Sequence, residues 1–364
     1  GGYNVAVGSL ALDANTTASN NTAVGYAALT ENTTATDNIA IGREALNSTT
    51  TGGYNVAIGR NAGFANTTGG NNVAIGYVAF DANTTGANNV AVGTSALGAN
   101  TTADANTAVG YNALILNTVG FSNTAVGAYA LDACTDGDDN TAIGYNALTA
   151  NTTAEDNTAV GSNALAANTT GASNVAIGYT ALDANTTASN NVGMGYAALG
   201  ANTTGASNVG LGTNALLSNT TASHNVAVGE DALRANTTGT QNVAVGAYVN
   251  DADTSPNYTV GVGYSALSAN TVDHVTAVGY GALGANTSGA GGTAVGSQAL
   301  TTNTTGANNT AVGLSALYGN TTGTENTSVG MNNMVTNSTG SYNTSVGAYA
   351  LDENTTANNN VAIG

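Results

Sequence analysis

Short apolar segments recur along the chain at a fixed spacing. Each has a β-branched residue, a tiny residue, an aliphatic residue and then glycine, as in Thr22-Ala23-Val24-Gly25. β-branched residues suit the pleated backbone of a strand, whose side chains alternate between its two faces. The pattern therefore predicts a short strand that ends at each glycine.

The glycines that close these segments, called marker glycines below, lie 17 residues apart from Gly8 to Gly263 and from Gly279 to Gly364, with one interval of 16 between. An unbroken period of this kind is typical of a solenoid. Glycine and Asn-Thr-Thr in most repeats leave no segment of helical length. We predict an all-β fold, a parallel β-solenoid (β-roll) with one 17-residue repeat per coil and about 21 coils. It forms a single continuous array over residues 1–364, with an irregular coil at 247–279.

The remaining columns of the repeat predict the rest of the coil. Leucine follows four residues after most marker glycines, as in Leu29, and predicts a second short strand or extended arm. The marker glycine itself predicts a positive φ or a close approach between coils. The tiny residue at the centre of each strand is never replaced by a charged residue, so we expect another chain to pack on that face. The candidate subunit interface is therefore Ala23, Ala40, Ala57, Ala74, Ala91 and Ala108.

Two asparagine columns carry most of the polar chemistry. Stacked coils would place the asparagines that open the strands (Asn21, Asn38 and Asn72) in a ladder, each amide donating to the next oxygen. The loop Asn-Thr-Thr is an acceptor sequence for N-linked glycans, although turn chemistry alone also explains it, because Asn117 and Asn270 keep the asparagine without the acceptor sequence. The candidate glycosylation sites are Asn15, Asn32, Asn66, Asn83, Asn100, Asn151, Asn168, Asn185, Asn202, Asn219, Asn236, Asn286, Asn303, Asn320, Asn337 and Asn354.

The charge balance limits the partners. The chain has no lysine, three arginines and a net charge of −18, which argues against nucleic-acid binding and against anionic bilayers. No apolar run reaches the roughly 20 residues that span a membrane, so we expect no membrane insertion of this segment. Cys134 is the only cysteine, which excludes an intrachain disulfide and a cysteine-based metal site.

No group of residues predicts catalysis. An enzyme on this fold needs an acid–base pair or a cationic subsite, and Arg43 and Arg60 form the only cationic pair. We therefore expect no enzymatic activity, no catalytic residue, no metal and no cofactor. The aspartates around Cys134 suggest a solvated acidic loop or a calcium site, and His224 and His274 suggest surface residues.

Tyrosines and one coil break the uniformity of the array. Tyrosine follows many marker glycines, as at Tyr26 and Tyr77, and suggests a partly exposed packing position or a stripe that stacks on sugars. The coil after Gly246 has the only proline, Pro256, and no leucine, and the 16-residue interval follows it. Two interpretations remain. The coil forms a kink or a recognition loop, or its sequence has diverged without a functional role and the change is absorbed in a loop.

The predicted core is thin, with about two large interior groups per coil, one valine or isoleucine of the strand and one leucine, each worth about 1.5–3 kcal/mol when buried. Because ordering each residue costs on the order of 1.5 kcal/mol, we expect the chain to associate with copies of itself. Both ends of the sequence lie in repeat register, so we expect a segment of a longer chain or a unit that assembles end to end.

The Asn-Thr-Ala-Val-Gly and Asn-Val-Ala-Ile-Gly segments, each followed by x-x-Ala-Leu, resemble the head repeats of trimeric autotransporter adhesins (the YadA-like head) and similar arrays in phage tail fibres. The resemblance covers the whole chain. The family's repeat is shorter, and the additional residues here fit the Asn-Thr-Thr-Gly loop. The resemblance implies a left-handed β-roll, a homotrimer, and an adhesive or spacer role in an extracellular location or at the cell or virion surface.

Two functions follow as hypotheses. The first is a structural extracellular fibre, the shaft or head of an adhesin, with or without covalent glycans and with a cell-surface receptor as partner. The alternative is a surface-binding module that uses one face of the β-solenoid to bind glycans or ice.

Overall fold

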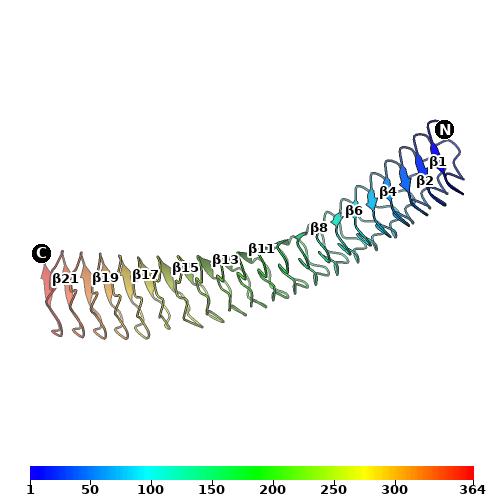
Figure 1. Cartoon of the computed structure of the whole chain (residues 1–364). Coiled ribbons are helices and arrows are strands. Elements are labelled where there is room, and N and C mark those ends of the chain that lie inside the picture. The colour runs from blue at the N-terminus through cyan, green and yellow to red at the C-terminus, as the bar shows by residue number, and fades with distance from the viewer. The chain divides into compact units, whose positions relative to one another are not determined.

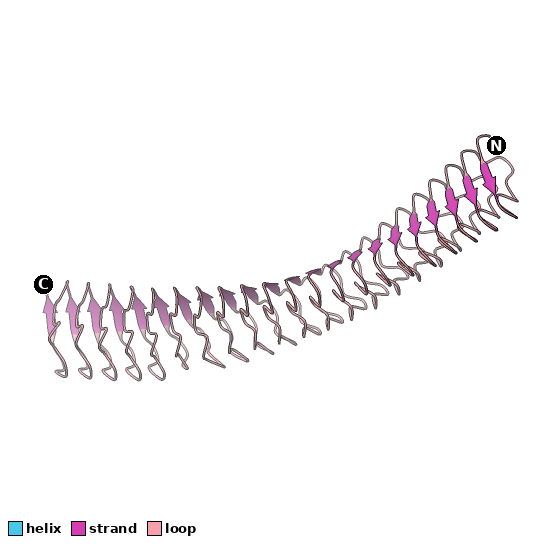
Figure 2. Cartoon of the chain, in the orientation of Figure 1, coloured by secondary structure: helices cyan, strands magenta, loops and turns pink.

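The computed structural model describes all residues, 1–364, and contains strands, turns and loops but no helix (Figure 2). No helix is therefore present that could cross a bilayer. The chain divides into two compact units, Gly1–Thr187 and Ala188–Gly364, which are described separately. Each unit is a parallel β-solenoid with a 17-residue repeat, and the chain has about 21 coils. This confirms the predicted fold class.

Every coil contributes one strand of three residues. In the first unit the strands are β1 (Val5–Val7), β2 (Thr22–Val24), β3 (Ile39–Ile41), β4 (Val56–Ile58), β5 (Val73–Ile75), β6 (Val90–Val92), β7 (Thr107–Val109), β8 (Thr124–Val126), β9 (Thr141–Ile143), β10 (Thr158–Val160) and β11 (Val175–Ile177). In the second unit they are β12 (Val192–Met194), β13 (Val209–Leu211), β14 (Val226–Val228), β15 (Val243–Val245), β16 (Val260–Val262), β17 (Thr276–Val278), β18 (Thr293–Val295), β19 (Thr310–Val312), β20 (Thr327–Val329), β21 (Thr344–Val346) and β22 (Val361–Ile363).

Within each unit, consecutive strands lie side by side in one parallel sheet (Figure 1). The register is that of the repeat, so that Ala23 pairs with Ala40 one coil later. Only the pairing of β16 with β17 spans 16 residues, from Val260 to Thr276. The strands keep their register there, so the missing residue is taken from the loop.

The marker glycines are required for two reasons at once. Gly110 has φ of +142°, a region that residues with a Cβ rarely adopt. A Cβ added to Gly110 would lie 2.4 Å from the carbonyl oxygen of Gly127 in the next coil. The predicted positive φ and the predicted close approach are both confirmed.

The segment after the marker glycine is a series of turns, not the second strand that the sequence suggested. Ala27 and Leu29 lie in the left-handed region, with φ of +55° and +49°, as do the residues at the same two positions of the other coils. Each such non-glycine residue costs roughly 1–2 kcal/mol. Left-handed residues at every second position turn the chain back over the strand, so that Leu29 packs inside its own coil and is fully buried.

The interior of each coil is narrow and is filled by small residues. In the coil that contains β2, the strand centre Ala23 is fully buried, together with Ala28 and Leu29. The residues on either side of the strand centre, Thr22 and Val24, point outward and are only partly buried. The assignment of the two strand faces from the sequence was therefore wrong.

The expected subunit interface is corrected in the same way. The six alanines proposed for it lie inside their own coils, at most 2% exposed, so no second chain can reach them. A Leu side chain packs against the strand centre, where only alanine, glycine or serine stands. These six residues are Ala23, Ala40, Ala57, Ala74, Ala91 and Ala108.

Candidate functional site

The outer face of the sheet is a regular, uncharged surface of each unit. It consists of the first and third residue of every strand, which are valine, isoleucine, threonine, leucine or methionine. Ile39, Ile41 and Ile58 are 39%, 39% and 37% exposed, and Met194 and Val346 are 39% and 40% exposed in the second unit. None of the 21 acidic and three basic residues lies in a strand, so this face is uncharged in a chain with a net charge of −18.

The asparagines proposed to carry glycans lie inside the coils. Apart from Asn15 and Asn354, the sixteen candidates are buried, and these fourteen are at most 1% exposed. The Asn83 amide nitrogen donates to Asn66 Oδ1 at 2.8 Å and to the Gly86 carbonyl at 3.1 Å. A glycan on this nitrogen would require the coil to open, so N-linked modification does not fit the folded repeats. The buried candidates are Asn32, Asn66, Asn83, Asn100, Asn151, Asn168, Asn185, Asn202, Asn219, Asn236, Asn286, Asn303, Asn320 and Asn337.

These residues, seven after each marker glycine, are called loop asparagines, and those four before it strand asparagines. The strand asparagines form the expected ladder, with one addition. Asn89 donates its amide to Asn72 Oδ1 at 3.2 Å, and the backbone nitrogen of Asn89 donates to the same oxygen at 2.9 Å. A buried amide needs such partners because an unpaired polar group costs about 1–3 kcal/mol.

The loop-asparagine ladder is interrupted three times, at Thr49, Cys134 and Asp253. Thr49 Oγ1 and Asp253 Oδ2 have no hydrogen-bond partner, and neither does Asn117 Oδ1, which faces Cys134 in the next coil. Cys134 is buried, and that burial raises the pKa of its thiol to about 11. Cys134 is thus a packing substitute in the ladder and not a reactive surface thiol.

One polar cluster inside the second unit escaped the sequence analysis. Ser328 and Ser345 replace strand-centre alanines, and Asn333 replaces an interior alanine between them. Ser328 Oγ donates to Asn333 Oδ1 at 2.7 Å, and the Asn333 amide donates to Ser345 Oγ at 2.9 Å and to the Gly347 carbonyl at 2.7 Å. The signal was the coincidence of three polar substitutions in adjacent coils.

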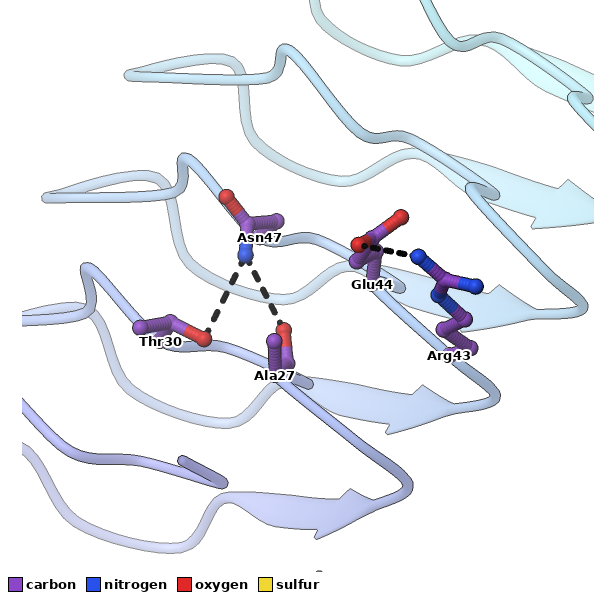
Figure 3. Close-up of polar contacts among 5 residues, drawn as sticks. All are labelled: Ala27, Thr30, Arg43, Glu44 and Asn47. Atoms are coloured by element: carbon purple, nitrogen blue, oxygen red, sulfur yellow. Dashed lines mark hydrogen bonds and ion pairs between the residues drawn. The ribbon is translucent and has the colours of Figure 1, made fainter. Parts of the chain in front are cut away.

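Tyrosines and arginines lie along the edge that follows the sheet. The guanidinium carbon of Arg43 lies 5.8 Å from the ring centroid of Tyr26, one coil earlier, and that of Arg60 lies 5.7 Å from the ring centroid of Tyr77, one coil later. Arg43 also pairs with Glu44 at 3.2 Å (Figure 3). The only cationic pair of the sequence is therefore held by aromatic rings and a carboxylate.

The tyrosines themselves form chains of contacts from coil to coil. In the first unit Tyr129 contacts Tyr111 and Tyr145 edge to face, with ring centroids 5.3 Å and 6.1 Å apart. In the second unit Tyr264 contacts Tyr248 edge to face at 5.6 Å and stacks on Tyr280 at 5.8 Å. About half of Tyr111, Tyr145, Tyr264 and Tyr280 remains exposed. The column is thus a partly exposed packing position.

The acidic loop near Cys134 uses its carboxylates as turn acceptors. Asp138 Oδ1 accepts from the Phe121 backbone nitrogen at 2.8 Å, and Asp132 Oδ1 accepts from the Thr149 hydroxyl at 2.6 Å. No group of three or more histidine, cysteine or acidic side chains is close enough to hold a metal ion. The acidic-loop interpretation fits these contacts.

The irregular coil combines several linked substitutions. In most coils, a loop carbonyl accepts a hydrogen bond from the amide of a strand asparagine, as the Pro256 carbonyl accepts from Asn242 at 2.6 Å. The coil after Gly263 lacks the residue that would supply this carbonyl. The strand asparagine that would donate to the missing carbonyl is replaced by Thr259. Val249 replaces an alanine, and its Cγ1 would lie 2.4 Å from a Cβ on Gly261. Within the second unit, the loss of the carbonyl is thus matched by the loss of its asparagine donor, and the larger Val249 by the smaller Gly261.

Neither a scan against protein-family models nor a search of curated proteins finds a match to this sequence.

Proposed function

We propose that this chain is the repetitive shaft or head of an extracellular fibre, an adhesin or a tail fibre at a cell or virion surface, in which copies associate through the outer face of the sheet. The observation that carries the proposal is the uncharged, partly exposed aliphatic face on a strongly acidic chain. Contiguous exposed apolar surface of this kind marks an interaction site.

The repeat of the face favours a second copy of the chain as its partner. Ile41, Ile58 and Ile75 recur at the coil spacing, and the same spacing continues along each unit. Only a partner with the same spacing can match such a surface over many coils, and another copy of this chain has it. The trimeric state comes from the resemblance to autotransporter heads, which places three copies around one axis.

The proposal includes no catalytic step. The repeated polar side chains are occupied in hydrogen bonds between coils, as in the pairs Asn83–Asn66 and Thr84–Thr101. The strand and loop asparagines therefore serve stability. A receptor would be bound by exposed loops or edges that differ between coils.

The mass of the full chain in solution tests this proposal. One chain has a mass of 35.2 kDa, and we expect light scattering coupled to size exclusion to give three times that value for the native protein. A sample that stays at the mass of one chain at concentrations up to about 100 μM would overturn it, because a stable interface associates well below that concentration.

A second candidate is ice binding by the same face. In β7 to β10 the outward residues are threonine and then valine or isoleucine in every coil, and β17 to β21 repeat this arrangement. Because the threonines point outward, they form a regular row of hydroxyls beside a row of aliphatic groups. Thermal hysteresis from a monomeric sample would favour this candidate over the fibre, whereas a trimer without hysteresis would exclude it.

A further inference from the structure

Depressions lie between the loops of successive coils, and the one at the irregular coil of the second unit, called the notch below, is larger than the one lined by Val119 and Phe121 in the first unit, which measures about 290 Å³. The backbone nitrogen of His274 donates to the Asn257 carbonyl, as that of Tyr258 donates to the Thr240 carbonyl one coil earlier. This alignment places the missing residue between Val272 and Asp273. The shortened loop lies between two full-length loops, and a depression of about 500 Å³ opens there.

The notch is lined by fixed polar groups. Asp273 Oδ1 accepts from the backbone nitrogen of Asn257 at 2.8 Å and from its side-chain amide at 3.3 Å. Asp273 Oδ2 has only a long contact of 3.4 Å to the same amide, which leaves acceptor capacity facing the notch. Thr238 and Ser255, which carry hydroxyls, also line it.

A flat aromatic surface adjoins these polar groups. The rings of Tyr258 and His274 are stacked, with centroids 5.0 Å apart and planes 3° apart, and His274 lines the notch. Tyr258 is 54% exposed. A ring pair of this kind offers an apolar plane next to hydrogen-bonding groups, the combination that small-molecule sites use for orientation and specificity.

We propose that this notch binds a neutral saccharide. A sugar presents hydroxyls that donate to a carboxylate such as Asp273, and a face of C–H groups that packs on an aromatic plane. No lysine or arginine lines the notch, and the chain carries a net charge of −18, which disfavours sialylated, sulfated or uronic sugars. The site belongs to a single chain and does not depend on association of copies.

The test uses the full chain on an array of neutral oligosaccharides, followed by calorimetric titration with D-galactose, D-mannose and N-acetyl-D-glucosamine in the presence of EDTA. We expect at least one of these sugars to bind with a Kd in the millimolar range. Asp273→Asn should weaken binding at least tenfold. The absence of binding by the native chain at about 10 mM sugar, or binding only when calcium replaces EDTA, would overturn the proposal.

Two further variants separate recognition from folding. Asp138→Asn is the matched control, because Asp138 has the same position in a regular coil and accepts the same kind of backbone hydrogen bond. It should leave binding unchanged, and an equal loss in both variants contradicts the proposal. Insertion of one glycine between Val272 and Asp273 restores the 17-residue loop. This insertion should narrow the notch and abolish binding without lowering the melting temperature, whereas retained binding contradicts a site that depends on the shortened loop.

Discussion

Asn55 and Asn66, eleven residues apart, donate their side-chain amides to the same atom, the carbonyl oxygen of Gly69, each at 2.9 Å. One asparagine precedes a strand and the other lies in the following loop. The same convergence occurs at Gly86, which accepts from Asn72 and Asn83. Because both lone pairs of the buried carbonyl are satisfied, the two ladders support one turn, and this explains why both columns are asparagine.

Loss of one loop asparagine should therefore destabilise its neighbours as well. Asn83→Ala removes the bonds to Asn66 Oδ1 and to Gly86, and leaves buried groups without partners. We expect a loss of about 2–4 kcal/mol in the free energy of unfolding. Thr85→Ala, at an exposed position of the same loop, should change it by less than about 0.5 kcal/mol. Native-state hydrogen exchange of the amides in β4 to β7 measures both, and equal protection in the two variants would contradict the ladder's role.

A methyl group on a marker glycine should disrupt the stacking of coils. Gly110→Ala would place a Cβ 2.4 Å from the Gly127 carbonyl oxygen at a φ of +142°, so we expect misfolding or a fall in melting temperature of more than 10 °C, a cost above about 3 kcal/mol. Gly98→Ala is the matched control, because its nearest contact is 3.3 Å and its φ is not positive. A Gly110→Ala protein that melts like the Gly98→Ala protein would show that the coils can shift apart.

Most of the fold can be predicted from the 17-residue repeat alone. The 17-residue period predicted the coil, the strand that ends at Gly25, and the close approach of successive marker glycines, because these features depend only on local sequence and translation. The ladder of strand asparagines followed from the same translation. The compensating pair Val249 and Gly261 could not be predicted, since no alternation places these residues in contact.

The sequence pattern predicted the wrong inner face of the strand. Large aliphatic residues usually lie inside, which suggested that Val24 faces the core and Ala23 the outside. The left-handed conformation of Ala27 and Leu29 folds the chain so tightly over the strand that only a small side chain fits beneath the leucine. That conformation is rare for alanine and leucine, and their presence gives no local signal of it. The same closure buries Asn32, which acceptor-sequence reasoning placed on the surface.

The buried polar cluster of the second unit should behave as one unit. Ser328→Ala leaves Asn333 Oδ1 without its 2.7 Å donor, and we expect a loss of about 1–3 kcal/mol. The triple variant in which Ser328, Asn333 and Ser345 all become alanine restores the interior of the other coils and should be nearly as stable as the native chain. Urea denaturation of the single and triple variants tests this, and additive losses would contradict the coupling.

Asp253 should make the second unit more stable at low pH. Burial, and secondarily the charge of Asp273, raises the pKa of its carboxyl group above the ordinary value. A raised folded-state pKa means that the stabilisation by protonation is complete below the unfolded pKa and is lost as pH rises through the folded pKa. Asp253→Asn should therefore raise the melting temperature at pH 7 and flatten its dependence on pH. Asp136→Asn, at an exposed loop position, is the control, and a similar gain there would contradict the assignment.

A negative charge on the outer sheet face should prevent association without unfolding the coil. Ile41→Glu and Ile58→Glu, made together, place two carboxylates at positions that are 39% and 37% exposed in the single chain. Solvent can hydrate them in a monomer, so the cost to the coil is limited to strand propensity, within about 1 kcal/mol for each. Between packed copies the same carboxylates would be buried without partners, which costs far more.

The matched control carries the same charges elsewhere on the first unit. Thr34→Glu and Thr51→Glu lie on exposed loop positions of neighbouring coils, away from the sheet. We expect light scattering to give the mass of one chain for the isoleucine pair and the native oligomer for the threonine pair, with circular dichroism unchanged in both. If the isoleucine pair keeps the native mass, the copies associate through another surface, and the edge with Tyr26 and Tyr77 becomes the next candidate. If the threonine pair also dissociates, the added charge alone separates the copies, and the sheet face loses its special role.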